Sequence, residues 1–340
     1  EFSVGNTRKS IKGIIARVQL EEFSKGIILP HEFTLSKAKE DRLNLMKATN
    51  CNFSQIYALY MDEKHTTLAT IDEQSKAKAD LEFTDETGVT HRLWIETDEE
   101  IIAKLVADFA DRKLYIADGH HRYETALNYR NYCRENGISK PGDPQDFQMI
   151  YLVDMEHPGL VVFPTHRLVR DLPNFDKEAV LEKCSEFFYI DEKEGTDTME
   201  EDLKKLYDEG KKAFGFYCGK GEWFLLTLKN IDFMSQMLPN VSKASQSLDV
   251  SVLHTLILEK IFGIDKENMA KQINLTYTKF FTEAIDGVDK GEFQCSFVLN
   301  PTRVTEIRDV AAAGEKMPQK STYFYPKMIT GMVMNNLGVD

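Results

Sequence analysis

The sequence predicts a mixed α/β (α+β) protein with two subdomains. Runs rich in β-branched and aromatic residues alternate with runs of helical periodicity along the whole chain. The stretch SKPGDPQDFQ, residues 139–148, contains two prolines and a glycine and is the best candidate for a linker. We therefore expect one subdomain over residues 1–140 and a second α/β subdomain over residues 145–340 that completes a cleft.

The first half is predicted to contain strands, helices and one hairpin. Residues 10–20 and 53–62 predict strands, and residues 26–50 predict a short apolar strand, a break at a proline and then a helix. Residues 80–98 alternate on both sides of a Glu-Thr-Gly turn and predict a hairpin, and residues 98–113 predict an amphipathic helix with an acidic first turn. The candidate caps and buried residues of the 26–50 helix are Thr34, Ser36, Leu43, Leu45 and Met46.

The second half mixes the same two kinds of element. Apolar alternation predicts strands and a hairpin, and 3.6-residue periodicity predicts helices. The predicted strands are residues 149–155, 159–169 and 293–302, the hairpin is 212–228, and the helices are 176–188, 198–210 and 250–263.

The segment LYIADGHHRYETAL carries the strongest functional signal. A buried strand ends at Asp118 and a helix follows directly. The first turn of a helix offers backbone N–H groups and a partial positive charge, which together favour a phosphate or a carboxylate. Gly119 would let the backbone approach that anion, Arg122 would add a fork of donors, and His120 and His121 would add directional ones. Asp118 could orient a histidine or hold Mg²⁺.

Two other interpretations of this segment are weaker. A capping role for Asp118 would explain why an acid and a glycine stand at the start of the helix. It would not explain why two histidines and an arginine follow them. A zinc site is disfavoured because adjacent histidines on a helix point about 100° apart. Its remaining ligands, His166 or His254, would have to come from distant segments.

Two loops carry further candidate residues. Pro30 fixes the chain just before His31 and Glu32, where a carboxylate could act as a general base for a hydroxyl nucleophile. From the residues alone, a surface acid is the more economical interpretation of Glu32. The late segment GEKMPQKSTYFYPK could clamp an anionic substrate or be an ordinary exposed loop; its cations and hydroxyls are Lys316, Lys320, Ser321, Thr322 and Lys327. Neither a Walker A loop nor a GxGxxG motif is present.

Composition restricts the partners and the location. The net charge is −13 with no long run of Lys or Arg, so nucleic acid is not an expected partner. Five scattered cysteines without a CxxC pair predict reduced thiols and a cytoplasmic protein. No apolar stretch approaches the roughly 20 residues that cross a bilayer, so no membrane partner is expected. The opening EFSVGNTRKS has neither a signal-peptide core nor a Met, and we expect a segment to precede it.

Six phrases that span the chain carry a resemblance to a known family. They are LPHEFTLSKAKEDRLNLMKA, IADGHHRYETAL, YLVDMEHPGLVVFPTHRL, LDVSVLHTLILE, INLTYTK and GEKMPQKSTYFYPK. Together they resemble a prokaryotic domain-of-unknown-function family (ten-fifteen), whose members are sometimes labelled SpoOJ/ParB-like. The wider resemblance is to the ParB/sulfiredoxin superfamily, in which a strand–turn–helix holds nucleotide phosphates. It implies a ParB/sulfiredoxin-like nucleotide-binding core in residues 1–140, preceded by a native N-terminal segment.

The functional resemblance is to the archaeal ADP-dependent free-serine kinase. That enzyme carries a PHE loop, a DGHHR turn and a late GE…PK[ST]T segment, and similar residues occur in the same order in this chain. The resemblance implies that Glu32 deprotonates the acceptor hydroxyl and that Asp118 supports Mg²⁺ or positions the phosphates. The implied phosphate-binding residues are Gly119, His120, His121 and Arg122, and the implied substrate-binding residues are His31, Lys320, Ser321 and Thr322. The interval from Glu32 to Asp118 is longer than in the kinase, and the inserted hairpin could reshape the acceptor pocket.

These observations lead to three hypotheses. The first is a nucleotide-dependent, kinase-like phosphotransferase that uses ADP, ATP or CTP with Mg²⁺ and acts on a small hydroxylated metabolite, with serine as the example that the resemblance supplies. The second is a nucleotide-binding regulator of the ParB-like type without a metabolite substrate. The late Lys-Ser-Thr loop favours the enzyme, because a switch needs no clamp for a second substrate. A metal-dependent hydrolase that uses the histidines is a more distant third hypothesis, and the oligomeric state stays open.

Overall fold

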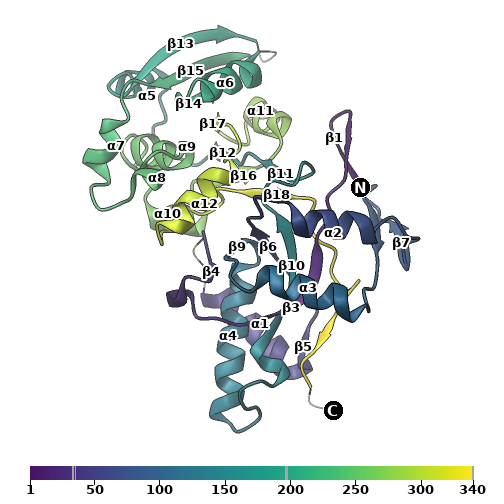
Figure 1. Cartoon of the computed structure of the whole chain (residues 1–340). Coiled ribbons are helices and arrows are strands. Elements are labelled where there is room, and N and C mark those ends of the chain that lie inside the picture. Colours follow the sequence, from purple (N-terminus) through teal and green to yellow (C-terminus); the bar gives the residue numbers. More distant parts are fainter. Residues whose placement is uncertain (33, 35, 196–197, 339–340) are drawn as a thin grey trace. The chain divides into compact units, whose positions relative to one another are not determined.

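The computed structural model of the chain describes residues 1–32, 34, 36–195 and 198–338 (Figure 1). It divides into two compact units: unit 1 comprises Glu1–Val161 and Phe324–Asp340, and unit 2 comprises Val162–Tyr323. The predicted boundary at residues 140–145 lies inside unit 1, where Gln145 and Asp146 are buried. The Pro/Gly-rich stretch is therefore a turn within one unit. The predicted mixed α/β class is confirmed.

Unit 1 is built on a five-stranded sheet with the strand order β3-β10-β6-β9-β4 (Figure 1). The central pair, β10 and β6, is parallel, whereas β3 pairs with β10 and β9 pairs with β6 in the antiparallel direction. The edge strand β4 runs parallel to β9, so the PHE loop that follows β4 emerges at the same end of the sheet as the end of β9. The strands are β3 (Ile14–Gln19), β4 (Ile28–Leu29), β6 (Ile56–Tyr60), β9 (Leu114–Asp118) and β10 (Phe147–Asp154).

The smaller elements of unit 1 surround this sheet. The helices are α1 (Ser36–Thr49), α2 (Thr66–Gln74), α3 (Glu99–Phe109) and α4 (His120–Glu135), with 3-10 turns η1 (Phe23–Lys25) and η2 (Pro144–Asp146). Three two-stranded pairs are β1 (Phe2–Val4) with β2 (Thr7–Lys9), β5 (Cys51–Asn52) with β19 (Asn335–Asn336), and the predicted hairpin β7 (Leu81–Thr84) with β8 (Thr90–Leu93).

The core of unit 1 forms where α4 and α1 pack on the sheet. Tyr123, Ala126 and Cys133 of α4 join the buried strand residues in one apolar cluster. Met46 of α1 is buried as predicted, whereas Leu45 is 39% exposed and that part of the prediction is wrong. The side chain of Ser36, a predicted cap, lies outside the described residues.

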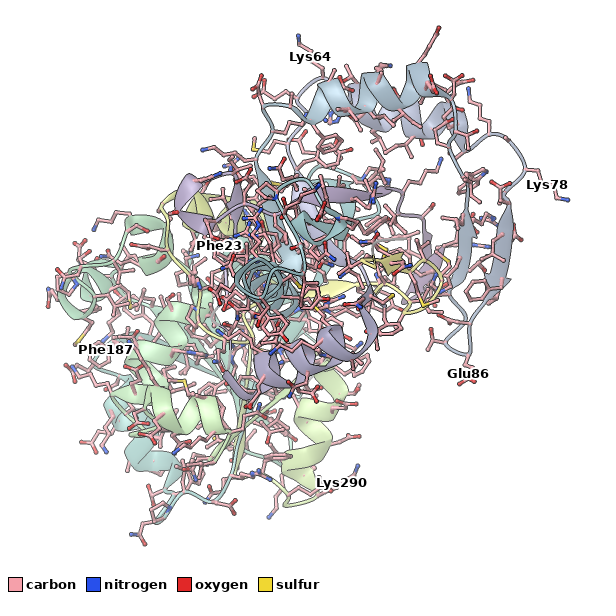
Figure 2. All side chains as sticks on the ribbon, turned by 90° about the horizontal axis from the view of Figure 1, so that it is seen from below. Phe23, Lys64, Lys78, Glu86, Phe187 and Lys290 are labelled. Atoms are coloured by element: carbon pink, nitrogen blue, oxygen red, sulfur yellow. The ribbon has the colours of Figure 1, made fainter. Side chains whose placement is uncertain are left out.

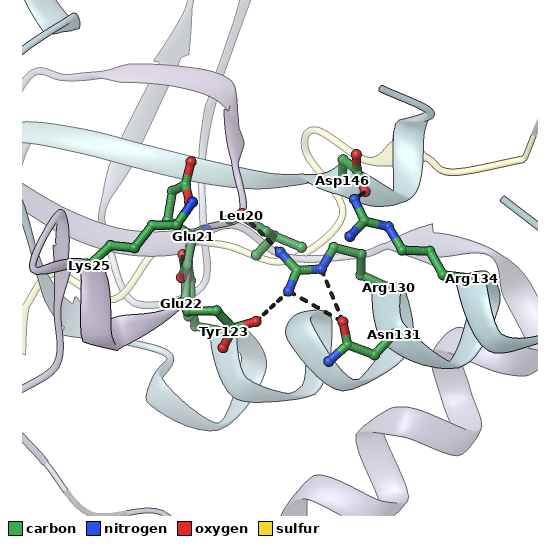
Figure 3. A network of polar contacts seen from close by, with 9 residues as sticks. All are labelled: Leu20, Glu21, Glu22, Lys25, Tyr123, Arg130, Asn131, Arg134 and Asp146. Atoms are coloured by element: carbon green, nitrogen blue, oxygen red, sulfur yellow. Dashed lines mark hydrogen bonds and ion pairs between the residues drawn. The ribbon is translucent and has the colours of Figure 1, made fainter. Parts of the chain in front are cut away.

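A polar network fixes α4 to the connection between β3 and η1 (Figure 3). The buried hydroxyl of Tyr123 accepts from the backbone N–H of Glu21 at 2.9 Å and donates to the Glu21 carbonyl at 2.8 Å. About two turns further along α4, Arg130 donates to the Leu20 carbonyl at 3.0 Å and forms an ion pair with Glu22. Because buried polar groups are costly unless hydrogen-bonded, these paired contacts fix the position of α4 along its axis. Side-chain hydrogen bonds also position the first turn of α4, where Arg122 donates to Ser54 Oγ at 3.0 Å.

Unit 2 contains a six-stranded sheet with the order β13-β15-β14-β17-β12-β16. Its strands are β12 (His166–Val169), β13 (Phe188–Glu194), β14 (Ala213–Tyr217), β15 (Glu222–Leu228), β16 (Leu275–Thr278) and β17 (Cys295–Val298). Its helices are α5 (Lys177–Cys184), α6 (Met199–Asp208), α7 (Asp232–Met237), α8 (Lys243–Gln246), α9 (Asp249–Val252), α10 (Lys266–Lys271), α11 (Phe281–Asp289) and α12 (Val304–Ala312). The strands β11 (Val161–Phe163) and β18 (Tyr323–Tyr325) lie where the chain passes from one unit to the other.

Two apolar clusters form the core of unit 2. The helix predicted over residues 250–263 is α9 followed by a π-helical segment, η3 (Leu253–Glu259). All five cysteines lie among the described residues and are free thiols, in agreement with the prediction. Within the described part of the chain, no helix is long and apolar enough to span a membrane.

Candidate functional site

The turn between β9 and α4 requires a glycine. Gly119 has φ 99° and ψ 26°, in the left-handed region, and is the N-cap of α4. A Cβ atom at this position would lie 3.0 Å from Nε and Nη2 of Arg122. Because Gly119 has no side chain, it supplies no side-chain cap to the N–H groups of the first helical turn. The strand–glycine–helix geometry is thus present, and the anion-binding role of Gly119–Arg122 stays a prediction.

Two cations share one carboxylate at this turn. Arg122 Nη2 donates to Asp118 Oδ2 at 2.7 Å, and Lys327 Nζ donates to Asp118 Oδ1 at 2.6 Å. Arg122 Nη1 also donates to Ser54 Oγ at 3.0 Å and to the Gln55 carbonyl. Burial lowers the pKa of the Arg122 guanidinium, and the negative charge of Asp118 opposes that shift. With both cations and Asp118 ionised, the group carries a net charge of about +1.

His120 and His31 form a contact between this turn and the end of β4. The backbone N–H of His31 donates to Nε2 of His120 at 3.2 Å, and the two rings lie edge to face with centroids 4.6 Å apart. The nitrogen of His120 that accepts this bond carries no proton. Burial lowers the pKa of His31 to about 4, although a hydrogen bond to the Ile116 backbone and the charge of Asp118 oppose the shift. His31 is therefore neutral at neutral pH and packs in the core beside the turn.

Glu32 follows His31 directly and is half-buried. The chain beyond it is fixed to α4, because Glu124 accepts hydrogen bonds from Thr34 Oγ1 and from Lys39 Nζ, both at 2.7 Å. Thr34 therefore bonds to α4 through its side chain, which its prediction as a helix cap did not anticipate. The structure places the PHE loop and the glycine turn in one unit and in contact through their histidines.

The predicted substrate loop, Lys320–Thr322, belongs to unit 2. Lys320 has a left-handed backbone with φ 58°. The Ser321 side chain is buried and donates to the Pro318 carbonyl, while its own carbonyl accepts from Thr302 Oγ1 at 3.0 Å. The Ser321 hydroxyl therefore holds the shape of the loop. The substrate-binding roles of His31, Lys320, Ser321 and Thr322 stay predictions.

Unit 2 also buries a histidine–arginine cluster, which contains the two histidines considered as zinc ligands, His166 and His254. Arg167 is 0% exposed, and Nε and Nη2 of its guanidinium donate to His254 Nε2 at 3.3 and 3.2 Å. Nη2 also donates to the Lys320 carbonyl at 3.1 Å, which connects Arg167 to the predicted substrate loop. Burial lowers the pKa of Arg167 to about 10 and that of His166 to about 3. His166 and His254 are core histidines.

The metal interpretation finds no support in this arrangement. Among the described residues, no group of three or more His, Cys, Asp or Glu side chains is arranged to hold a metal ion. The contact of Lys327 with Asp118 was also not predicted, because 209 positions separate the two residues and no local pattern relates them. Ser54 and Gln55, the other partners of Arg122, precede β6 and gave no signal in the sequence.

Comparison with known proteins identifies the family. The model of the family described as "Protein of unknown function (DUF1015)" matches residues 1–251, so the chain belongs to that family. No curated protein matches the chain.

Several solved structures are similar in fold at low identity. A conserved hypothetical protein from Pyrococcus furiosus is 15% identical with a TM-score of 0.44, and the match covers 96% of this chain and 97% of that one. Free serine kinase in complex with AMP is 13% identical with a TM-score of 0.45, covering 94% of this chain and 90% of that one. A mutant of free serine kinase in complex with ADP is 11% identical with a TM-score of 0.45, covering 94% and 91%. Likeness at this level carries no argument about activity, which has to be argued from the site itself.

Proposed function

We propose that the turn at Asp118–Arg122 binds the phosphate chain of a nucleotide, and that the protein transfers a phosphoryl group from it to the hydroxyl of a small metabolite. One observation carries the proposal: Arg122 and Lys327 converge on Asp118 at the start of a 16-residue helix whose N-cap residue is Gly119. Guanidinium and ammonium groups at a helix N-terminus are the donors that phosphate oxygens favour in proteins.

Asp118 takes the place that a phosphate oxygen would occupy between the two cations. The side chains of Arg122 and Asp118 are 26% and 36% exposed, so a ligand can reach both without unfolding the helix. A phosphate group carries roughly −1.5 to −2 charge at neutral pH and three acceptor oxygens. It can therefore replace a single carboxylate as the partner of both cations.

The chain's own residues fit a phosphate better than they fit Mg²⁺. Magnesium prefers about six oxygen ligands and is usually bound through one or two carboxylates together with water and substrate phosphates. At this turn both oxygens of Asp118 accept hydrogen bonds from cations. Magnesium that enters with ADP, ATP or CTP would be held chiefly by nucleotide oxygens and water, where it neutralises phosphate charge.

Glu32 is the proposed general base. It lies one residue from His31, whose backbone N–H is 3.2 Å from the His120 ring at the start of α4. In the transfer, the acceptor hydroxyl would give its proton to Glu32 while its oxygen forms a bond to the terminal phosphorus. The bond from that phosphorus to the leaving nucleotide oxygen would break in the same step. Positioning and charge neutralisation supply most of the rate in such reactions.

Substitution of Arg122 tests the phosphate site. Arg122→Ala removes two charge-assisted donors and should weaken nucleotide binding by roughly 1.5–3 kcal/mol, which is about 10- to 150-fold in Kd. Titration calorimetry with ADP, ATP and CTP, each with and without Mg²⁺, measures this effect. Arg134→Ala is the matched control, because Arg134 lies on the same helix, pairs with Asp146 at 2.6 Å and is 36% exposed. Equal affinities of the two folded variants would exclude the site.

Substitution of Glu32 separates the enzyme from the regulator. Glu32→Gln keeps the shape of the side chain but cannot accept the proton, so nucleotide affinity should stay within about twofold while turnover falls by roughly 10²–10⁴-fold. Glu40→Gln, at an exposed position of α1, is the control and should leave both unchanged. If the wild-type protein binds a nucleotide but transfers its phosphate to none of a panel of hydroxylated metabolites, the regulator hypothesis replaces the enzyme.

A further inference from the structure

Unit 1 contains a large trough whose lining includes Lys327 but not Asp118, Arg122 or Glu32 of the proposed site. Its volume is about 1780 Å³ and its lining residues all belong to unit 1. Small-molecule pockets usually measure about 300–1,000 Å³, so the trough is larger than a typical ligand needs. It is bounded by β3, by the hairpin β7–β8, by α3 and by residues 326–334; Figure 2 labels Glu86 at the turn of the hairpin and Lys78 in the segment before it.

One wall of the trough is an amphipathic helix with an uncovered apolar face. None of the residues of α3 is buried, and Val106 is 67% exposed and Ile102 42% exposed. The residues of α3 that line the trough include Ile101, Ile102, Leu105, Val106 and Phe109. A helix with such a stripe normally packs it against its own domain. In unit 1 this stripe faces the trough.

Another wall is the open edge of a β-strand. Among the described strands, β3 pairs only with β10 and lies at an edge of the five-stranded sheet. At the end of β3, the backbone N–H of Leu20 donates to the Asp146 carbonyl at 2.7 Å, so Leu20 and Asp146 form a hydrogen-bonded pair of residues. Hydrogen-bonded and non-hydrogen-bonded pairs alternate along an antiparallel ladder. The backbone groups of Ile15, Arg17 and Gln19 therefore point away from β10, and all three residues line the trough.

An open edge and an apolar helix face select the same kind of occupant. Exposed N–H and C=O groups at intervals of two residues are satisfied by another strand, and apolar side chains on alternate positions of that strand would cover α3. A strand occupies roughly 160 Å³ per residue, from its rise, the strand spacing and the sheet spacing. The trough therefore holds about ten residues of extended chain, enough to cover the six residues of β3.

We propose that this trough binds an extended peptide segment, which adds to the sheet as a strand beside β3. Apolar residues would alternate along the segment, and an acidic residue would lie opposite Arg17. Arg17 is exposed and, within the described part of the chain, has no carboxylate partner. Its guanidinium lies 5.8 Å from the Phe147 ring centroid and remains available to an acid on the incoming strand.

Two other occupants fit these observations less well. A second copy that paired β3 with β3 about a two-fold axis would bring two Arg17 side chains together, and like charges across a strand pair are destabilising. A small apolar molecule would cover α3 but would leave the edge N–H and C=O groups without partners in an apolar setting, at a cost of roughly 1–3 kcal/mol each.

A synthetic peptide tests the proposal. The probe is a fluorescein-labelled peptide of about ten residues in which valine alternates with threonine and a central threonine is replaced by glutamate. Binding is measured by fluorescence anisotropy on the 340-residue chain. Hydrogen exchange should show added protection at the amides of Ile15, Arg17 and Gln19. A peptide with proline at the centre lacks the N–H that the edge requires and should bind at least tenfold more weakly.

Protein variants localise the binding. Arg17→Glu should weaken the glutamate peptide about tenfold and should prefer a peptide with lysine at the same place. Val106→Asp puts a charge in the trough and should weaken binding at least tenfold. Ala107→Asp is its matched control, because Ala107 lies on α3 and is exposed but does not line the trough, so affinity should change less than about twofold.

The following outcomes would overturn the proposal. They are no binding of the alternating peptide at millimolar concentration, or binding without protection of the three β3 amides. The proposal would also fail if an apolar fluorophore displaced the peptide and Val106→Asp bound the peptide as tightly as the wild-type protein does. A dimer in sedimentation experiments that Val106→Asp dissociates would assign the trough to a second copy. None of these outcomes bears on the phosphate site, whose test uses Arg122.

Discussion

The glycine turn of unit 1 and the buried cluster of unit 2 are each built on a His-Arg dipeptide, and they treat the arginine charge in opposite ways. Arg122 has a side chain that is 26% exposed and shares Asp118 with Lys327. Arg167 is 0% exposed and, among the described residues, has no carboxylate partner. Its guanidinium donates to His254 and to main-chain carbonyls instead.

The difference separates a charge that can exchange partners from one that cannot. The Arg122 side chain is partly exposed, and under the proposed function a phosphate would replace Asp118 as its partner. Arg167 is fully buried, and displacing its guanidinium would leave the Thr165 and Lys320 carbonyls without these hydrogen bonds. A histidine–arginine pair therefore indicates a ligand site only when the arginine is accessible and its negative partner can be displaced.

The largest expected effect is on the stability of unit 2. Arg167→Ala leaves a cavity and unsatisfied carbonyls, and we expect it to lower the free energy of unfolding by roughly 2–4 kcal/mol. Arg167→Met fills much of the space and removes an uncompensated charge, so its cost should be much smaller. Urea denaturation measures both, with Arg308→Ala at a partly exposed site of unit 2 as the control. If the methionine variant is as unstable as the alanine variant, the charge itself is required and the comparison fails.

The next effect concerns acid stability in both regions. The pKa of His31 is lowered to about 4 and that of His166 to about 3, so below pH 6.5 the unfolded chain binds protons that the folded chain does not. The free energy of unfolding should therefore fall as the pH decreases from about 6.5 to 4, with each histidine contributing up to roughly 1.4 kcal/mol per pH unit.

Single substitutions assign this pH dependence. His31→Asn should flatten the dependence of the unfolding free energy between pH 6.5 and 4, measured by urea denaturation at several pH values. The control is His65, whose pKa is raised by its hydrogen bond to Asp154, so its contribution to stability is lost only as the pH rises above about 6.5. His65→Asn should therefore leave the curve between pH 6.5 and 4 nearly unchanged and alter it only above pH 6.5. A curve that His31→Asn leaves unchanged would mean that His31 is not held neutral in the folded protein.

The smallest expected effect is at the second cation of the turn. Lys327 is 41% exposed, and an exposed ion pair contributes about 0–1 kcal/mol. Lys327→Ala should weaken nucleotide binding by less than about fivefold, well below the effect of Arg122→Ala, and should leave the unfolding free energy nearly unchanged. Lys204→Ala removes a similar surface pair with Asp208 in unit 2 and is the control for net charge. A loss as large as that of Arg122→Ala would make Lys327 an equal partner in the site.

Local chemistry explains why the turn could be predicted. A left-handed backbone at the start of a helix needs glycine, and the apolar run before Asp118 needs a buried strand. Both requirements involve residues that are neighbours in the chain. The same holds for the hairpin of residues 80–98 and for most of the predicted strands, which the structure confirms within a few residues.

The partners of the turn could not be predicted, because they are distant in the sequence. Lys327 lies 209 positions from Asp118, and His31 lies 89 positions from His120. The boundary between the units was also hidden. The proline-rich stretch near residue 140 looked like a linker, yet it packs into unit 1, and the chain leaves that unit only at Val161.

Two helices of unit 1 show most plainly what sequence and tertiary structure each decide. The sequence of α3 alone determines an amphipathic helix with an apolar stripe and an Asp98 cap, but none of its residues is buried. The sequence of α4 has a weaker stripe, yet eight of its residues are buried, including His120 and Arg130. A pattern of side chains determines which face of a helix can be buried, because it depends on neighbours three and four residues apart. What covers that face depends on distant segments, and only the tertiary structure decides it.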